Sequence, residues 1–222
     1  MRGGRPWRGW TGELALCLFL VLAALPARGG LCSAPSGDPR HDFEFLAGYS
    51  PGSSTFLIGR APDRRFAIAG FAYSYRCLLE RSLAISYTGT VLPAAILFEP
   101  AETYYLGGSP AAEFRYPAHA VYGAAVEPVG FTFEFARRRR LEPIVELGVG
   151  IVASTEPVPF NIPGGTGLNF LAELGGGVRW KLTRTRAVEA GYRLMHISNA
   201  NTTGVNPGID NHVLWIGFSL DR

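Results

Sequence analysis

Eight stretches of this chain alternate apolar side chains with polar or small ones, and a period of two is typical of β-strands. They cover residues 42–49, 65–77, 82–98, 119–136, 141–154, 168–182, 186–199 and 211–220. After the N-terminal segment, no stretch has the 18 or more uninterrupted apolar residues of a membrane-spanning helix. With 28 Gly and 16 Pro among 222 residues, the composition suits one β-rich domain. The sequence therefore predicts an all-β fold.

The two faces of these strands differ in character. In 168–182 the even positions carry apolar residues such as Leu174 and Trp180, whereas Glu173 and Arg179 occupy odd positions, and 141–154 and 186–199 show the same split. A soluble sandwich would bury the apolar face and leave the charged face in water. A small membrane barrel turns the apolar face to lipid and keeps the charges inside, where they can pair.

The lengths of the connections favour the barrel. The connections after the first, third, fifth and seventh stretches are long and rich in Gly, Pro and Ser, whereas those after the second, fourth and sixth are short. Short periplasmic turns that alternate with longer extracellular loops are typical of outer-membrane barrels. The sequence thus predicts an eight-stranded antiparallel transmembrane barrel of the outer membrane, entered from the periplasm. The run "RRRR" at 137–140 is interpreted as a solvated periplasmic turn rather than as a nucleic-acid patch.

The N-terminus has the pattern of a secretory signal peptide. Three arginines precede the apolar run from Leu14 to Leu25, and small residues follow it up to Gly29. We predict a signal peptide at residues 1–29 and a barrel hydrolase domain at 30–222. A retained membrane anchor is the alternative, but the run is about 12 residues long and a spanning helix needs about 20. Four of the 21 basic residues and one of the 18 acidic residues lie in this segment. The remaining chain is formally neutral, and no nucleic-acid partner is predicted.

The cysteines suggest neither a cofactor nor a metal site. Cys17 would leave with the signal peptide, and Cys32 and Cys77 could pair in an oxidising compartment, although two cysteines carry no recognisable spacing. Their pairing stays open, and no metal or cofactor is predicted.

Three polar residues near the C-terminus have the types of a catalytic triad. His196 and Ser198 share a strand face at the end of 186–199, with Cα atoms about 6.6 Å apart. Asp210 is in phase with the next stretch, and residues directly opposed in an antiparallel hairpin share a face. Asp210 is therefore expected beside His196 and Ser198, as acid, base and nucleophile. The alternative is that the three residues merely lie among lipid headgroups.

These residues also carry a resemblance. "HISNA" followed by "NPGID" resembles the active-site hairpin of the PagL-type lipid A 3-O-deacylases, which are outer-membrane barrels of eight strands. The resemblance implies that Ser198 is the nucleophile, His196 the base and Asp210 the acid, with Asn199 as the motif asparagine. The family pattern has Glu where this chain has Asp210.

The turn after the motif supplies further candidates for contacts with substrate or an oxyanion: Asn199, Ala200, Asn201 and Asn206. Asn201 stands where the family pattern has glycine, and asparagine can adopt a positive φ at modest cost.

The resemblance implies a serine esterase that removes the 3-O-linked acyl chain of lipid A, in the outer membrane of a Gram-negative-type bacterium and without a cofactor. Its partners would be lipopolysaccharide and outer-membrane lipid. Two alternatives stay open: a barrel without catalysis that acts in structure or adhesion, and an esterase acting on phospholipid. The sequence also leaves open whether two copies form a homodimer.

Overall fold

The computed structural model describes residues 39–105, 113–137, 139–160 and 162–222. The predicted signal peptide and Cys32 lie outside these residues. No helix in the described ranges is long and apolar enough to cross a membrane.

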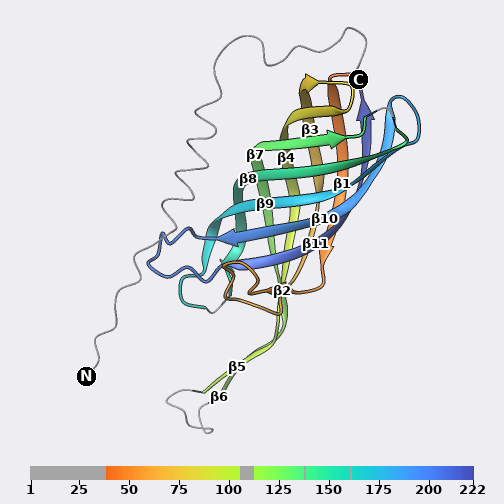
Figure 1. Ribbon diagram of the computed structural model, residues 1–222. Coiled ribbons are helices and arrows are strands. Elements are labelled where there is room, and N and C mark those ends of the chain that lie inside the picture. The colour runs from red at the N-terminus through yellow and green to blue at the C-terminus, as the bar shows by residue number, and fades with distance from the viewer. Residues whose placement is uncertain (1–38, 106–112, 138, 161) are drawn as a thin grey trace. The chain divides into compact units, whose positions relative to one another are not determined.

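Eight long antiparallel strands form the molecule (Figure 1). They are β1 (His41–Ser50), β3 (Arg65–Leu79), β4 (Leu83–Glu99), β7 (His119–Phe135), β8 (Leu141–Val158), β9 (Thr166–Lys181), β10 (Arg186–Ser198) and β11 (Ile209–Asp221). Each strand pairs with its neighbour in this order, and β1 also pairs with β11, from Asp42 opposite Asp221 to Tyr49 opposite Leu214. The sheet is therefore a closed barrel, which confirms the predicted fold and rules out the sandwich.

Three short strands were not predicted. β2 (Ser53–Ser54) pairs with the start of β11, and β5 (Glu102–Tyr105) pairs with β6 (Glu113–Tyr116) as a separate hairpin in the second long connection. Two long strands also extend further than expected, because β8 continues to Val158 and β11 begins at Ile209.

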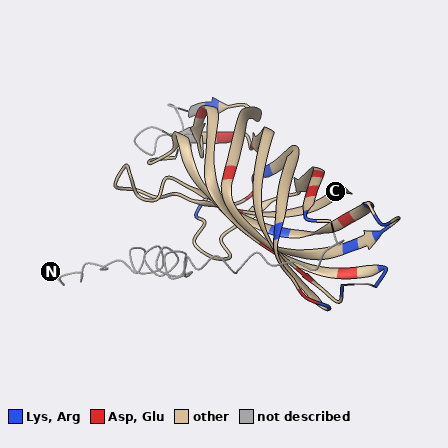
Figure 2. Ribbon diagram, turned by 90° about the horizontal axis from the view of Figure 1, so that it is seen from above, with Lys and Arg blue, Asp and Glu red and all other residues tan. Residues whose placement is uncertain are grey.

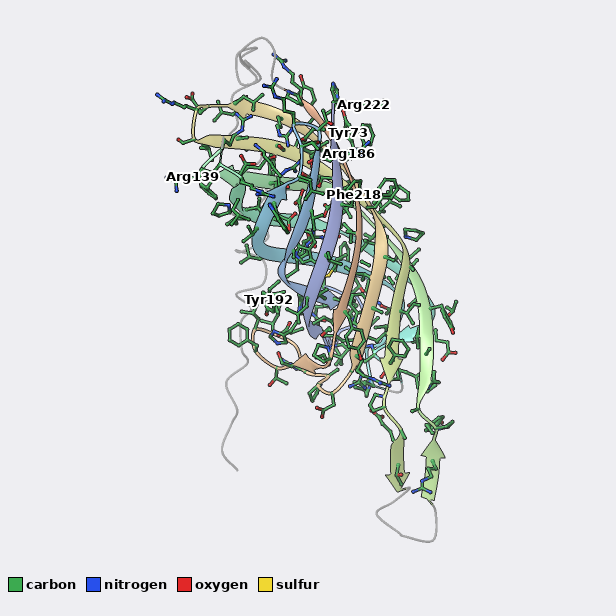
Figure 3. All side chains as sticks on the ribbon, turned by 90° about the vertical axis from the view of Figure 1, so that its right-hand side faces the viewer. Tyr73, Arg139, Arg186, Tyr192, Phe218 and Arg222 are labelled. Atoms are coloured by element: carbon green, nitrogen blue, oxygen red, sulfur yellow. The ribbon has the colours of Figure 1, made fainter. Side chains whose placement is uncertain are left out.

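The outer wall of the barrel is apolar. Its exposed side chains include Phe45, Leu168, Leu174, Leu214 and Ile216. Figure 3 shows Tyr73, Tyr192 and Phe218 on this outer surface. The even positions of β9 point outward, as the alternation predicted, and burying this surface in lipid stabilises a membrane barrel.

Figure 2 shows charged residues on the strands toward the end with the short turns, and many of these side chains are buried inside the barrel. Arg179 forms ion pairs with Asp42, Glu189 and Asp221. Arg193 pairs with Glu146 at 3.1 Å, and its guanidinium lies 4.2 Å from the ring centroid of Trp215. These pairs offset the cost of burying charge away from water.

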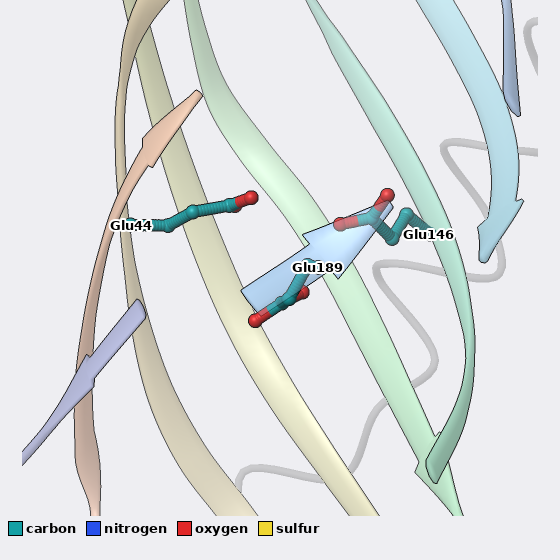
Figure 4. Close-up of side chains that lie close together, drawn as sticks. All are labelled: Glu44, Glu146 and Glu189. Atoms are coloured by element: carbon teal, nitrogen blue, oxygen red, sulfur yellow. The ribbon is translucent and has the colours of Figure 1, made fainter. Parts of the chain in front are cut away.

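Within the described ranges, one group of acidic side chains has metal-ligand spacing (Figure 4). Glu44, Glu146 and Glu189 bring carboxylate oxygens within 4.8 Å of one another in the barrel interior. Arg179 contacts Glu189 and Arg193 contacts Glu146, so two guanidinium groups partly neutralise this cluster.

Toward the end with the long connections the interior holds a cluster of apolar side chains. Phe66, Leu97, Val121, Val152 and Ile197 pack there against one another. Side chains thus fill the barrel at both ends. The triad-type residues lie on its outer wall, near the end with the long connections.

Candidate active site

His196 and Asp210 meet where β10 and β11 approach the end with the long connections. They are direct partners in the strand register, as the hairpin argument predicted. His196 Nδ1 lies 2.6 Å from Asp210 Oδ1. This pairing favours the tautomer in which Nδ1 carries the proton and donates it to the carboxylate.

A segment far away in the sequence holds the second carboxylate oxygen of Asp210. Asp210 Oδ2 accepts hydrogen bonds from the backbone N–H groups of Leu57 at 2.7 Å, Ile58 at 3.2 Å and Gly59 at 3.0 Å. The connection between β1 and β3, residues 51–64, is named the first loop here. It covers Asp210, whose side chain is fully buried. No local sequence pattern indicates this cover, because the first loop and Asp210 are about 150 residues apart in the chain.

Ser198 occupies the same strand face as His196, and its neighbour in β9 is Phe170. His196 Nε2 is buried and has no hydrogen-bond partner, so no bond joins it to the Ser198 hydroxyl in this conformation. Catalytic hydrogen bonds are often long or absent without substrate and form in the reacting complex. The imidazole thus has one nitrogen fixed by the acid and one unpartnered nitrogen available for a proton.

Asn199 holds the turn that follows β10. Its Nδ2 lies 2.6 Å from Gly164 O and 2.8 Å from Val205 O, and its Oδ1 accepts the N–H of Asn201 at 2.7 Å. The side chain is buried and ties the turn after β10 to the connection between β8 and β9. It therefore organises the turn that follows the nucleophile candidate.

The other candidates in this turn are placed as follows. Ala200 and Asn201 have φ values of 49° and 66°, so Asn201 does adopt the positive φ expected of it. Its N–H is already bonded to Asn199, which leaves that group poorly suited to an oxyanion in this conformation. Asn206 has a buried side-chain oxygen without a partner.

His212 lies two residues after Asp210 on the same face of β11, but it contacts other groups. Its Nε2 lies 2.6 Å from Ser54 Oγ and its Nδ1 lies 2.5 Å from the Tyr192 hydroxyl. Both ring nitrogens are thus engaged away from His196. Ser54 and His212 form a hydroxyl–imidazole pair, but the other ring nitrogen of His212 faces a tyrosine hydroxyl, where a triad has a carboxylate.

Gly208 is predicted to be essential for the position of the His196 ring. Its φ is +46°, and a Cβ built there would lie 2.9 Å from His196 Cε1. Gly208→Ala should therefore displace the ring, and a misplacement near 1 Å costs about 10²-fold in rate. The matched control is Gly204→Ala, because Gly204 also has a positive φ of +77° but open space around its Cβ. If His196 acts as a base, the turnover of the two purified variants should differ by that factor; equal turnover would contradict the prediction.

A closed barrel with an apolar outer wall and a charged interior defines an outer-membrane β-barrel protein. The chain belongs to the lipid A 3-O-deacylase (PagL) family, whose model matches residues 96–219. The matched region includes His196, Ser198 and Asp210. Family and fold together confirm the expected location in the outer membrane of a Gram-negative-type bacterium.

The chain is also similar to solved structures of outer-membrane proteins. The crystal structure of the outer membrane enzyme PagL has 16% sequence identity and a TM-score of 0.54, over 79% of this chain and 97% of that one. Neisserial surface protein A has 13% identity and a TM-score of 0.48, over 82% and 97%. The N-terminal barrel domain of Pseudomonas aeruginosa OprF has 14% identity and a TM-score of 0.43, over 83% and 100%. No curated protein sequence matches significantly.

Proposed function

We propose that the protein is a serine esterase that removes the 3-O-linked acyl chain of lipid A, with Ser198, His196 and Asp210 as its triad. The observation that carries the proposal is the 2.6 Å contact between His196 Nδ1 and Asp210 Oδ1. It leaves the buried Nε2 unpartnered on the strand face of Ser198. Membership of the lipid A 3-O-deacylase family supports the choice of substrate.

In the proposed mechanism, Ser198 Oγ attacks the ester carbonyl carbon while His196 Nε2 takes the hydroxyl proton. The tetrahedral intermediate collapses, the bond to the sugar oxygen breaks, and His196 delivers the proton to that oxygen. Water then attacks the acyl-enzyme with the same base, and the fatty acid leaves. Asp210 fixes the imidazole and stabilises its charged form. Ala200 and Asn206 remain candidates for stabilising the oxyanion.

The proposed orientation places the triad in the outer leaflet. With the short turns in the periplasm, the long connections and the triad face outward, at the height of lipid A. The acyl chain would lie along the outer wall beside Tyr192, Leu214 and Ile216, which are exposed. Leu194, which the alternation placed in the same apolar stripe, is buried and contributes little surface.

Mass spectrometry of lipid A tests this function. Cells that express the chain should produce lipid A lacking one hydroxy-acyl group, because hydrolysis at the 3-position releases it. Correctly inserted protein with an unchanged lipid A profile would favour the non-catalytic role in structure or adhesion. Release of fatty acid from phospholipid vesicles, with intact lipid A, would instead favour the phospholipid esterase.

A further inference from the structure

The first loop is fastened to the edge of β11 beyond the end of β1, next to the candidate triad. Ser53 and Ser54 pair with Asn211 and Asp210, and Ser54 Oγ contacts His212 Nε2. At the other end of the loop, the N–H of Arg60 lies 2.8 Å from the carbonyl oxygen of Pro207. Both ends are thus held, and the segment between them crosses over Asp210.

The middle of this loop presents three consecutive apolar side chains to the outside. Phe56, Leu57 and Ile58 are 71%, 57% and 61% exposed. Three neighbouring apolar side chains with this exposure are unfavourable in water, because burying each is worth about 1.5–3 kcal/mol. Such a patch marks an interaction surface.

The patch is continuous with the lipid-facing wall. The Phe56 ring packs edge-on against His212 with 6.1 Å between ring centroids, and His212 in turn packs against Tyr192 at 5.9 Å. Leu214, the next outward residue along β11, is 63% exposed. Aromatic side chains at this height match the girdle that barrels place at the membrane–water boundary. The surface next to the patch is thus membrane lipid rather than another protein.

We propose that Phe56, Leu57 and Ile58 insert among the acyl chains of outer-leaflet lipid, so that the membrane itself seats the first loop on Asp210. The N–H groups that bind Asp210 Oδ2 belong to Leu57, Ile58 and Gly59. Leu57 and Ile58 therefore contact lipid with their side chains and bind Asp210 through their backbone N–H groups. Insertion of these side chains into lipid therefore also holds the carboxylate of Asp210 in place. Phe56, Leu57 and Ile58 act as positioning residues. This inference rests on the proposed function only where it concerns the acid.

Fluorescence tests the lipid contact without any catalysis. In a chain whose Cys32 and Cys77 are replaced by serine, Ile58→Cys is labelled with an environment-sensitive dye and inserted into phospholipid vesicles that contain doxyl-lipid quenchers. Gly52→Cys is the matched control, because Gly52 lies in the same loop with open space around its Cβ. Quenching should be several-fold stronger at position 58. Equal quenching, or stronger quenching at position 52, overturns the lipid contact whether or not the protein is an esterase.

Kinetics test the coupling to the acid. Phe56→Ser combined with Ile58→Ser keeps every backbone N–H but weakens lipid contact, and turnover should fall about tenfold. The fall should appear for lipid A in vesicles and also for a short soluble ester, since both need Asp210 in place. A loss confined to lipid A would show that the loop only docks the substrate, and would overturn the coupling. Leu141→Ser is the control, as an exposed apolar residue at the opposite end of the barrel. An inactive unmodified chain would contradict the proposed function but leave the fluorescence result standing.

Discussion

Ser198→Ala and His196→Ala are each expected to lower the deacylation of lipid A by at least about four orders of magnitude. Each substitution removes a group that forms or breaks a bond in the proposed mechanism. Both side chains lie on the outward-facing side of β10, away from the ion pairs of the barrel interior, so the fold should survive. Lipid A mass spectrometry gives the activity, and the shift in gel migration on heating reports whether the barrel is folded.

Ser54→Ala is the control for the nucleophile. Ser54 has a hydroxyl 2.6 Å from an imidazole nitrogen, that of His212, yet this pair lacks a carboxylate partner. We expect a much smaller loss in Ser54→Ala than in Ser198→Ala. A larger loss in Ser54→Ala than in Ser198→Ala would identify Ser54 as the nucleophile and His212 as the base.

Asp210→Asn should reduce turnover by about 10⁴-fold, as replacement of the acid by its amide does in a serine protease. The amide cannot stabilise the imidazolium, and its NH₂ group would face either His196 Nδ1 or the three backbone donors of the first loop. Rates on a short soluble ester, measured with purified and folded variants, separate this loss from an effect of expression. A silent Asp210→Asn together with an inactive His212→Ala would remove Asp210 from the orienting role.

Asp210→Glu introduces the residue that the family pattern has at this position. A hairpin with the spacing usual for that pattern would accommodate glutamate. In the structure Asp210 lies directly opposite His196, is fully buried and has both oxygens bonded. One additional methylene must push either the imidazole or the first loop away. We expect a clear loss of activity in Asp210→Glu, because both oxygens of the shorter acid are already bonded in this buried position.

The fold could be predicted from the sequence because its signals are local. Apolar and polar residues alternate within single strands, and connection lengths alternate between the two ends of the barrel, so strand order follows without long-range information. The pairing of His196 with Asp210 could also be predicted from the sequence, because both residues lie in one hairpin.

Other features of the site depend on contacts that no local pattern encodes. Leu57 and Asp210 are 153 positions apart, and only the closure of β1 onto β11 brings the first loop to the acid. Likewise, the hydrogen bond from Asn199 to Gly164 joins two different loops. The only trace of the first loop in the sequence was an apolar triplet, 56–58, inside a connection rich in Gly, Pro and Ser.

The candidate triad lies on the outside of the barrel and not in its lumen, which charged and apolar side chains fill. Under the proposed function, substrate therefore arrives by lateral diffusion, and both the shortened lipid and the released fatty acid leave within the same leaflet. Substrate and products therefore move only within the plane of the membrane. The rate of the reaction is then governed by the mole fraction of substrate among neighbouring lipids, and dilution of the surrounding water leaves that fraction unchanged.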